Sequence, residues 1–451
     1  MRGAYCAALV FPARIPYNRA MSEHTSPTSA APLAPATQQA DADILILGAG
    51  PAGMLCALTA ARRAKAAKVR KEILLVDQDR TPARKLRASG GGRSNCTNLN
   101  AAPEHYLSKN PRFTAQALKR LPPAEFLRLL EGLGLSAHEE DQGKMFCDQG
   151  AEALALALEK ACRKAGCRFL LGRPVTGVVP PAEPGGLFRV DTAHGPLYAP
   201  RVALALGSPA WPALGGTDVV ARLAGQLGLI HVPARPALTP LVLSGPEAAL
   251  CRELTGLSVS ARLSLDAASA CGGVSIADSL LFTHQGLSGP AALRLSSYWR
   301  KGEAISIDLA PEADMPALLR QPGRGKALAR TILSELMPRR LVEARLAELP
   351  PQFKARSIGD RRLAELSRAD LDALAGIVGS WRVIPRTTAG MARAEAASGG
   401  LDVEAFSAKT MQCKAIPGLF ALGEALDVAG DLGGFNLHWA WASGFAAGHA
   451  L

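Results

Sequence analysis

The chain has 451 residues, of which 48% are hydrophobic and 20% are charged, a composition typical of a globular protein with room for two or three domains. No uninterrupted apolar run reaches the roughly 18 residues that a membrane-spanning helix needs, so we expect no membrane span. The net charge of +12 is compatible with nucleic acid, anionic lipid or acidic ligands, but the basic residues are scattered and a compositional bias is the favoured explanation.

The first 40 residues differ from the rest of the chain. They are rich in Ser, Thr, Pro and Ala and show little periodicity. Met21 opens a plausible start, so residues 1–20 are either an extension that is not translated or a targeting peptide, because three arginines precede the first acidic residue, Glu23. An apolar core followed by a small-residue cleavage site is missing, so we do not expect a secretory signal. We leave residues 1–40 out of the fold prediction.

The nine cysteines indicate a reducing compartment. Their number is odd, their spacing is irregular, and no C-x-x-C pair or Cys/His cluster with zinc-ligand spacing occurs. We therefore predict a cytoplasmic protein without a metal site. Cys162 and Cys167 have the spacing of a disulfide-reductase pair, but they follow a helical stretch far from the first glycine loop, so we interpret them as structural.

A strand over residues 43–47 runs directly into a G-x-G-x-x-G motif at 48–53. Gly48 permits the tight turn, Gly50 lets a pyrophosphate approach the backbone, and Gly53 lets the following helix pack on the strand. The helix would offer its free N–H groups to the phosphates. The order of strand, glycines and helix predicts a dinucleotide-binding unit.

A second strand over 73–76 ends at Asp77, whose carboxylate can accept hydrogen bonds from ribose hydroxyls. The loop that follows, from Ser89 to Asn98, contains three glycines and several polar side chains, and Lys85, Arg87 and Arg93 add positive charge. Such a loop suits a phosphate or an electron-rich ring edge. The alternative is a polar surface loop.

The sequence pattern changes in the middle of the chain, which predicts an insertion. Short strand-like runs punctuated by Gly and Pro fill about 211–310, which suggests a small barrel or sandwich, and a helical pattern fills about 312–378. We predict four parts: the extension 1–40, the first part of the dinucleotide-binding domain at 41–210, an inserted domain at 211–380, and the C-terminal part of the first domain at 381–451. The fold class is α/β, with a Rossmann-like domain interrupted by a β-rich and helical insert.

The last segment with candidate ligand-binding residues is glycine-rich and covers 423–436. Glu424 follows a strand, so its carboxylate can bind a polyol such as a ribityl chain, and Gly433 and Gly434 allow a flat ring close to the backbone. A helix that begins near Asn436 would direct its positive end at a ring oxygen that gains charge on reduction. The alternative for Glu424, and more strongly for Asp427 and Asp431, is an ordinary surface carboxylate.

These motifs resemble the BaiN/RdsA-like (YhiN-type) flavoproteins, NAD(P)/FAD-dependent oxidoreductases that include aminoacetone oxidase. The resemblance covers residues 42–451 and rests on the segments 46–53, 89–98, 281–290 and 423–436. It implies a bound FAD, redox chemistry and, as an occasional donor, NADH or NADPH.

The chain departs from the family pattern at three positions. The family loop usually reads Arg-Cys-Asn where this chain has Arg93-Ser94-Asn95, so we do not expect a mechanism that needs that cysteine. Asp77 replaces a usual Glu, and His438 replaces a usual Gln beside the predicted flavin edge.

The motifs and the resemblance together predict a set of cofactor-binding residues. They are Gly48, Ala49, Gly50, Pro51, Ala52, Gly53, Asp77, Gln78, Lys85, Ser89, Gly90, Gly92, Arg93, Asn95, Thr97, Asn98, Val175, Gly207, Gly423, Glu424, Gly434, Asn436 and Leu437.

The catalytic acid or base is not identified by the sequence. His284 and His438 are the candidates, because a neutral imidazole can exchange protons near neutral pH. The alternatives are a structural turn histidine for His284 and a plain hydrogen-bond donor for His438. Trp439 and Trp441 are interpreted as helix packing rather than as a substrate platform.

Three functions fit these observations. The first is an FAD-dependent oxidoreductase that acts on a small molecule, with NAD(P)H or the substrate itself as the electron donor. The second is a flavin-dependent reductase of an RNA base, which the resemblance permits and the net charge of +12 would serve. The third is an FAD-binding module without catalysis. The sequence does not define the substrate or the oligomeric state.

Overall fold

The computed structural model describes residues 39–451, and the prediction for residues 1–40 therefore lies almost entirely outside the described residues. Two hydrophobic cores organise the described part. The first core takes residues from 42 to 227 and from 401 to 451, whereas the second core takes residues from 241 to 383. Both ends of the described chain thus share the first core, and the second core is inserted between them in sequence.

Five parallel strands form the sheet of the first core, in the order β21-β11-β1-β2-β7. The strands are β1 (Ile44–Leu47), β2 (Ile73–Val76), β7 (Arg168–Leu170), β11 (Val202–Leu204) and β21 (Leu419–Ala421). β1 and β2 are buried along their whole length, which explains their continuous rather than alternating apolar sequence. Strand β21, from the far end of the chain, completes the sheet beside β11.

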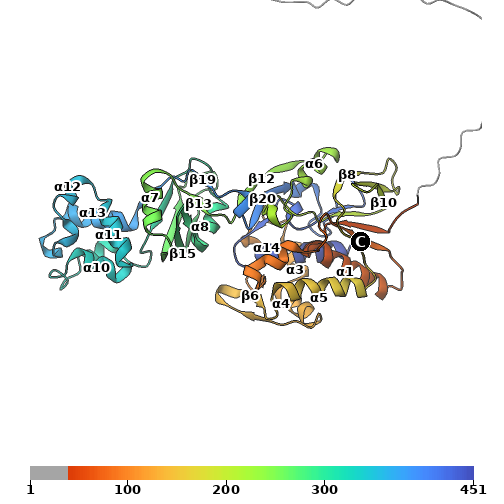
Figure 1. The fold of residues 1–451 in the computed structure, drawn as a ribbon, viewed down its shortest axis with the longest axis horizontal. Helices are drawn as coiled ribbons and strands as arrows, with labels where there is room; N and C mark the ends of the chain where they lie inside the picture. The colour runs from red at the N-terminus through yellow and green to blue at the C-terminus, as the bar shows by residue number, and fades with distance from the viewer. Residues whose placement is uncertain (1–38) are drawn as a thin grey trace, which may run out of the picture. The chain divides into compact units, whose positions relative to one another are not determined.

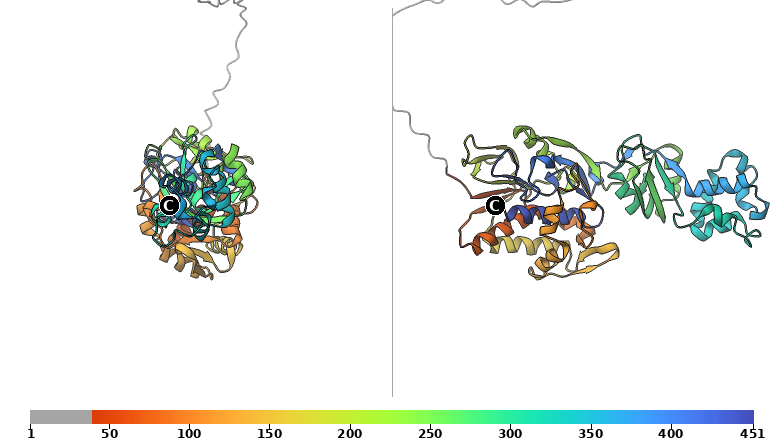
Figure 2. Two further views of the ribbon diagram at one scale, coloured as in Figure 1. Left: turned by 90° about the vertical axis from the view of Figure 1, so that its left-hand side faces the viewer. Right: turned by 180° about the vertical axis from the view of Figure 1, so that it is seen from behind.

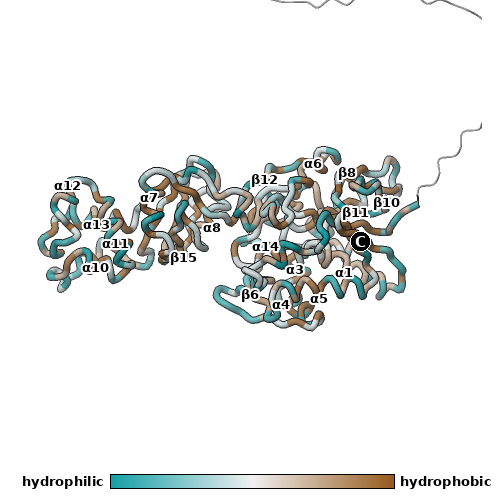
Figure 3. The backbone as a smooth tube through the Cα atoms, viewed as in Figure 1, coloured by the Kyte–Doolittle hydropathy of each residue, from teal (hydrophilic) through white to brown (hydrophobic). Residues whose placement is uncertain are grey.

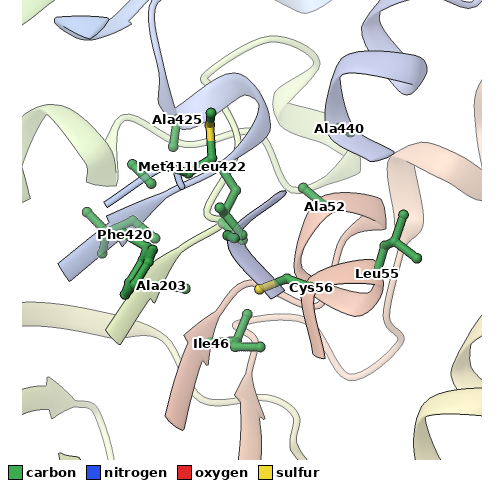
Figure 4. Close-up of a cluster of buried hydrophobic side chains, with 14 of the residues drawn as sticks. Ile46, Ala52, Leu55, Cys56, Ala203, Met411, Phe420, Leu422, Ala425 and Ala440 are labelled. Carbon is green, nitrogen blue, oxygen red and sulfur yellow. The ribbon is translucent and has the colours of Figure 1, made fainter. Parts of the chain in front are cut away.

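Three helices pack together beside this sheet: α1 (Pro51–Ala66), α5 (Gly150–Lys164) and α14 (Phe435–Gly448) (Figures 1 and 2). α14 lies close to α1 because glycine leaves room for the neighbouring backbone: a Cβ on Gly444 would lie 2.3 Å from the carbonyl oxygen of Ala52. Side chains such as Ile46 and Cys56 fill the space between the sheet and the helices (Figure 4). This packing fixes the start of α1 at the end of β1.

Smaller elements complete the first core. One antiparallel sheet contains β8 (Val175–Val179), β9 (Phe188–Thr192) and β10 (Leu197–Ala199). Another contains β3 (Asn95–Asn98), β5 (Ala137–Glu139) and β6 (Lys144–Cys147). A further pair joins β4 (Tyr106–Leu107) to β22 (Ala429–Gly430). The short helices are α2 (Arg84–Ala88), α3 (Ala115–Arg120), α4 (Pro123–Glu131) and α6 (Val219–Gln226).

The second core contains a seven-stranded antiparallel sheet in the order β18-β17-β14-β15-β16-β13-β19. Its strands are β13 (Leu241–Val242), β14 (Ser258–Leu265), β15 (Ser275–Thr283), β16 (Gly286–Ser288), β17 (Ile305–Asp308), β18 (Trp381–Val383) and β19 (Thr387–Thr388). Its helices are α7 (Gly245–Glu253), α8 (Gly289–Ser296), α9 (Met315–Leu319), α10 (Ala329–Leu336), α11 (Arg339–Ala347), α12 (Pro351–Lys354) and α13 (Arg368–Gly379). In Figure 3 the backbone is hydrophobic (brown) around β11 and β15, within the two cores.

The junction between the cores differs from the expected domain boundaries. Val219 and Leu223 of α6 pack in the first core, and β12 (His231–Ala237) pairs antiparallel with β20 (Ala396–Leu401). We therefore propose that the insert extends from about residue 238 to about residue 389 rather than from 211 to 380. In the described part of the chain, no helix is both long and apolar enough to cross a membrane.

Candidate active site

A cavity of about 630 Å³ lies where the parallel strands of the first core end. Gly48, Asp77, Ala205 and Leu422, the residues that directly follow β1, β2, β11 and β21, all line its wall. Ligands in open α/β sheets bind beyond the carboxyl ends of the strands, so this is the position in which a nucleotide is expected.

The cavity brings together most of the residues predicted to bind a cofactor. Those on its wall are Gly48, Gly50, Pro51, Ala52, Asp77, Gln78, Lys85, Ser89, Gly90, Asn95, Val175, Gly207, Gly423, Glu424, Gly434, Asn436 and Leu437. The others, Ala49, Gly53, Gly92, Arg93, Thr97 and Asn98, do not line it.

The glycines of the first loop have different local requirements. Gly48 has a positive φ of 110°, and a Cβ there would lie 2.1 Å from the carbonyl oxygen of Ala205. A Cβ on Gly53 would lie 2.0 Å from the carbonyl oxygen of Gly48. Gly50, in contrast, has no heavy atom within 4 Å of its Cβ position and lies open to the cavity. Gly48 and Gly53 therefore shape the loop, and Gly50 leaves room for a ligand.

Asp77 holds this loop in place. Its carboxylate accepts hydrogen bonds from the backbone N–H of Ala49 at 2.6 Å and from that of Asp79 at 2.8 Å. Burial raises the pKa of Asp77, and the two backbone hydrogen bonds act against this rise. The carboxylate thus connects the end of β2 to the glycine loop at the end of β1.

Glu424 is held by two polar neighbours on the opposite part of the wall. Its carboxylate accepts a hydrogen bond from Ser208 Oγ at 3.0 Å and forms an ion pair with Lys85 Nζ at 3.3 Å. Lys85 also contacts the carbonyl oxygen of Ser208 at 3.3 Å. Segments that are distant in the sequence therefore meet at one polar position on the wall.

Thr97 and Asn98 act behind the wall rather than on it. Asn98 Nδ2 donates to the carbonyl oxygen of Gly433 at 2.8 Å, and a Cβ on Gly434 would lie 2.5 Å from the carbonyl oxygen of Thr97. Asn436 closes the same loop, because its Oδ1 accepts from Gly430 N at 2.8 Å. The glycine-rich segment is therefore fixed against β3.

Arg93 and His284 do not face the cavity. The guanidinium of Arg93 lies 4.3 Å from the ring centre of Phe146, and its Nη1 is 2.6 Å from the carboxylate of Glu140. His284 lies on an exposed turn between β15 and β16 of the second core. Neither the expected FAD contact of Arg93 nor an acid–base role of His284 has support from this geometry.

His438 is also displaced from the cavity. Its ring is fully buried in α14, and its Nδ1 lies 2.7 Å from Thr97 Oγ1. Burial lowers the pKa of His438 to about 4, so the ring is neutral near neutral pH. His438 joins α14 to β3 and does not reach the space in which a substrate would lie.

The neutral state of His438 predicts a loss of stability in acid. The unfolded chain binds a proton below the ordinary pKa of about 6.5, whereas folded His438 does so only near pH 4, so the free energy of unfolding falls between these values by up to roughly 3 kcal/mol. The His438→Gln variant should lose less stability over this range. Urea unfolding at several pH values measures the difference. Identical pH profiles for both proteins would contradict the assignment.

The wall also contains residues that were not identified from the sequence, among them Lys144, Phe146, Trp211 and Glu395. Trp211 follows the end of β11, and the polar turn beginning at Gly207 was the available signal. Lys144 and Phe146 belong to β6, which pairs with β3, so the long-range pairing brings them to the wall. Nothing in the local sequence of Glu395 marks it as part of a site.

The chain is similar to proteins of known name along almost its whole length. A ribosomal RNA dihydrouridine synthase from Escherichia coli is 37% identical over 412 residues, which cover 91% of this chain and 98% of that protein. A protein of the same name from Haemophilus influenzae is 34% identical, over 89% of this chain and 96% of that protein. A 3-dehydro-bile acid delta(4,6)-reductase from Clostridium scindens is 28% identical, over 90% of this chain and 98% of that protein.

A family model described as the HI0933-like protein Rossmann domain matches residues 42–450. With the relatives above, it confirms the resemblance that the glycine motifs indicated. The parallel sheet and the match also confirm the predicted α/β fold, with a Rossmann-like domain of the FAD-binding type and additional inserted elements. The chain belongs to the HI0933-like Rossmann-domain family.

Proposed function

We propose that this protein is an FAD-dependent oxidoreductase that reduces the C5–C6 double bond of a uridine in ribosomal RNA. The observation that carries the proposal is the cavity wall, on which Gly50, Glu424 and Gly434 meet. The RNA substrate, which was an alternative at the level of the sequence, is favoured by the two relatives that are 37% and 34% identical and carry the name dihydrouridine synthase.

The residues of the wall fit FAD. The open space at Gly50, next to the N-terminus of the 16-residue helix α1, suits a pyrophosphate. Glu424 is placed to accept hydrogen bonds from hydroxyl groups, and the N-terminus of α14, which follows Gly434, suits a ring oxygen that gains negative charge. When bound, FAD would supply two electrons as a hydride, taken from a donor such as NADH or NADPH.

The names of all three relatives describe one type of chemistry. Dihydrouridine is uridine with two added hydrogens, and a delta-reductase removes a carbon–carbon double bond. Uracil C5 and C6 are conjugated to a carbonyl group, which makes C6 open to a hydride. A reductase of a small conjugated ketone is the second candidate, supported by the bile acid reductase.

Two arginines favour RNA over a small molecule. Arg386 and Arg393 lie on the segment that leads from the second core back to β20, and both side chains are exposed. Among the described residues neither forms an ion pair, whereas half of the arginines of the insert do. Arg393 is two residues from Glu395 on the cavity wall, so phosphates beside a bound base would meet positive charge there.

The test measures whether the reduced protein transfers electrons to RNA. The protein is reconstituted with FAD, reduced anaerobically with NADPH or NADH, and mixed with ribosomal RNA transcripts that contain no modified bases. We expect the flavin absorbance to bleach with the donor and to return with the RNA, and mass spectrometry of the nucleosides to show dihydrouridine. Reoxidation by a conjugated steroid ketone but not by RNA would favour the second candidate, and no flavin spectrum would exclude both.

The double variant Arg386→Glu/Arg393→Glu tests the RNA contact separately. Two lost phosphate contacts should reduce the slope of log affinity against log salt by about 1.5. Arg70→Glu is the matched control, because this side chain is 90% exposed and lies outside the cavity wall. An unchanged slope in the double variant would show that RNA does not contact this segment.

A further inference from the structure

The cavity wall carries five carboxylates, Asp77, Asp79, Glu395, Glu424 and Asp431, and four of them are engaged. Asp77 accepts two backbone hydrogen bonds, and Asp79 pairs with Arg84 at 2.9 Å. Glu424 is bound by Ser208 and Lys85. Asp431 is the most tightly bound of the five, and Glu395 has no side-chain partner among the described residues.

Asp431 is connected to the insert. Arg294 of α8 donates to its carboxylate through Nε at 3.0 and 3.1 Å and through Nη2 at 2.7 Å. Arg294 also lies 3.5 Å from Asp278. The oxygens of Asp431 are thus engaged by a cation from the insert.

Glu395 is the carboxylate without a partner. Among the described residues its side chain forms neither a hydrogen bond nor an ion pair, and its position is set by its backbone N–H, which donates to the carbonyl oxygen of Leu238 at 3.2 Å. Leu238 forms a small buried cluster with Ala237 and Ala396, and Leu432 packs against that cluster. Since Leu432 precedes Gly433 and Gly434, Glu395 lies near the part of the cavity that suits the flat ring.

The surroundings of Glu395 favour its protonated form. The Glu395 side chain is exposed, but it lies on the concave wall of the cavity. The protein that surrounds it there raises the pKa of Glu395 through burial. The pKa of the group is not lowered by a cation, because no basic side chain contacts it. A carboxyl group of this kind can keep its proton closer to neutral pH and release it to a substrate.

We propose that Glu395 donates the proton in the reduction of the double bond. The proposal rests on the function proposed above. The C5–C6 double bond is reduced by two electrons when C6 receives a hydride from the reduced flavin and C5 receives a proton from the carboxyl group of Glu395. Two C–H bonds form, the π bond is lost, and water returns a proton to the carboxylate.

The other acids on the wall fit this role less well. No His, Cys or Tyr of the described residues lines the cavity. Lys85 is engaged by Glu424, which leaves Lys144 of β6 as the other proton-bearing side chain near Gly433. Lys144 forms an ion pair with Asp141 at 3.9 Å.

The experiment measures the step in which the substrate is reduced. Holoenzyme with FAD is reduced beforehand, mixed with unmodified ribosomal RNA transcripts, and the return of flavin absorbance is followed in a single turnover at several pH values. In the native protein the rate should fall as the pH rises through the pKa of Glu395. In Glu395→Gln it should be at least about 100-fold slower and independent of pH, and Glu395→Asp should restore part of the rate with a pH dependence. Glu312→Gln, an exposed glutamate outside the wall, is the matched control.

A second readout does not depend on turnover. Infrared spectra of the native holoenzyme without RNA should show the C=O stretch of a protonated carboxyl group, and this band should be absent from Glu395→Gln. The FAD content and the rate of reduction by NADPH should be the same in both proteins. A native rate in Glu395→Gln would overturn the assignment of Glu395 as the proton donor but not the proposed function. A loss of the pH dependence in Lys144→Gln rather than in Glu395→Gln would have the same meaning. If native holoenzyme is not reoxidised by the RNA, the proposed function fails, and the role of Glu395 in it fails too.

Discussion

Replacing Gly48 with alanine should destabilise the first core by about 2–6 kcal/mol and remove FAD binding. The cause is twofold. Gly48 has a φ of 110°, which a residue with a Cβ rarely adopts, and the added Cβ would lie 2.1 Å from the carbonyl oxygen of Ala205. The oxygen is a backbone atom and the Cβ is attached directly to the backbone of the neighbouring strand end, so no side-chain rotation can relieve the contact. Urea unfolding and flavin absorbance after reconstitution measure the two effects.

Gly50→Ala is the matched control two positions along the same loop. The backbone φ of Gly50 is −78°, and its Cβ position has no heavy atom within 4 Å, so the variant should unfold at the same urea concentration as the native protein. Its new methyl group would occupy the space proposed for a pyrophosphate, and FAD affinity alone should fall. Equal stability of Gly48→Ala and Gly50→Ala would contradict this account of the loop.

Truncating Trp441 to alanine should lower the free energy of unfolding by about 3–5 kcal/mol. The side chain is 1% exposed, its ring stacks on Phe126 with the centres 5.2 Å apart, and its Nε1 donates to the carbonyl oxygen of Cys96 at 2.8 Å. The truncation would leave a cavity between α14 and β3. Because β3 places Asn95 on the wall of the main cavity, we also expect weaker FAD binding.

Trp441→Phe separates packing from hydrogen bonding. It keeps an aromatic ring against Phe126 and loses the donor to Cys96, so it should cost only about 1–2 kcal/mol. Thermal unfolding and an FAD titration of both variants give the comparison. If both variants cost the same, the hydrogen bond rather than the filled volume dominates at this position.

The glycine motifs could be predicted from sequence because their requirements are local. A strand that runs into G-x-G-x-x-G and a helix has one common geometry, so Gly48, Gly50 and Gly53 could be assigned roles without the fold. The same holds for Glu424, which lies on the wall because it follows the last strand of the sheet. The matching family model confirmed the fold class that these motifs indicated.

The remaining parts of the site depend on pairing between distant segments. Glu395 reaches the wall because β20 pairs with β12 across the insert, and its local sequence contains no sign of this. His284 lies in a glycine-rich turn that resembles a site in sequence but is an exposed hairpin of the second core. The position of His438 within a buried helix depends on the packing of α14 against β3. Short-range patterns therefore identified loops that line the cavity and missed the proposed proton donor.

The position of β21 and α14 after the insert has a consequence for biosynthesis. The first core needs β21 at the edge of its sheet and α14 on α1, so it cannot close while these residues are still in the ribosome. At about 5–20 residues per second, on the order of half a minute separates the emergence of Gly50 from that of Glu424. During that interval the sheet and helices of the insert, between residues 241 and 388, emerge complete, whereas β1 and β2 still lack the elements that complete their core. We therefore expect cofactor loading to be a late step, which follows the emergence of β21 and α14.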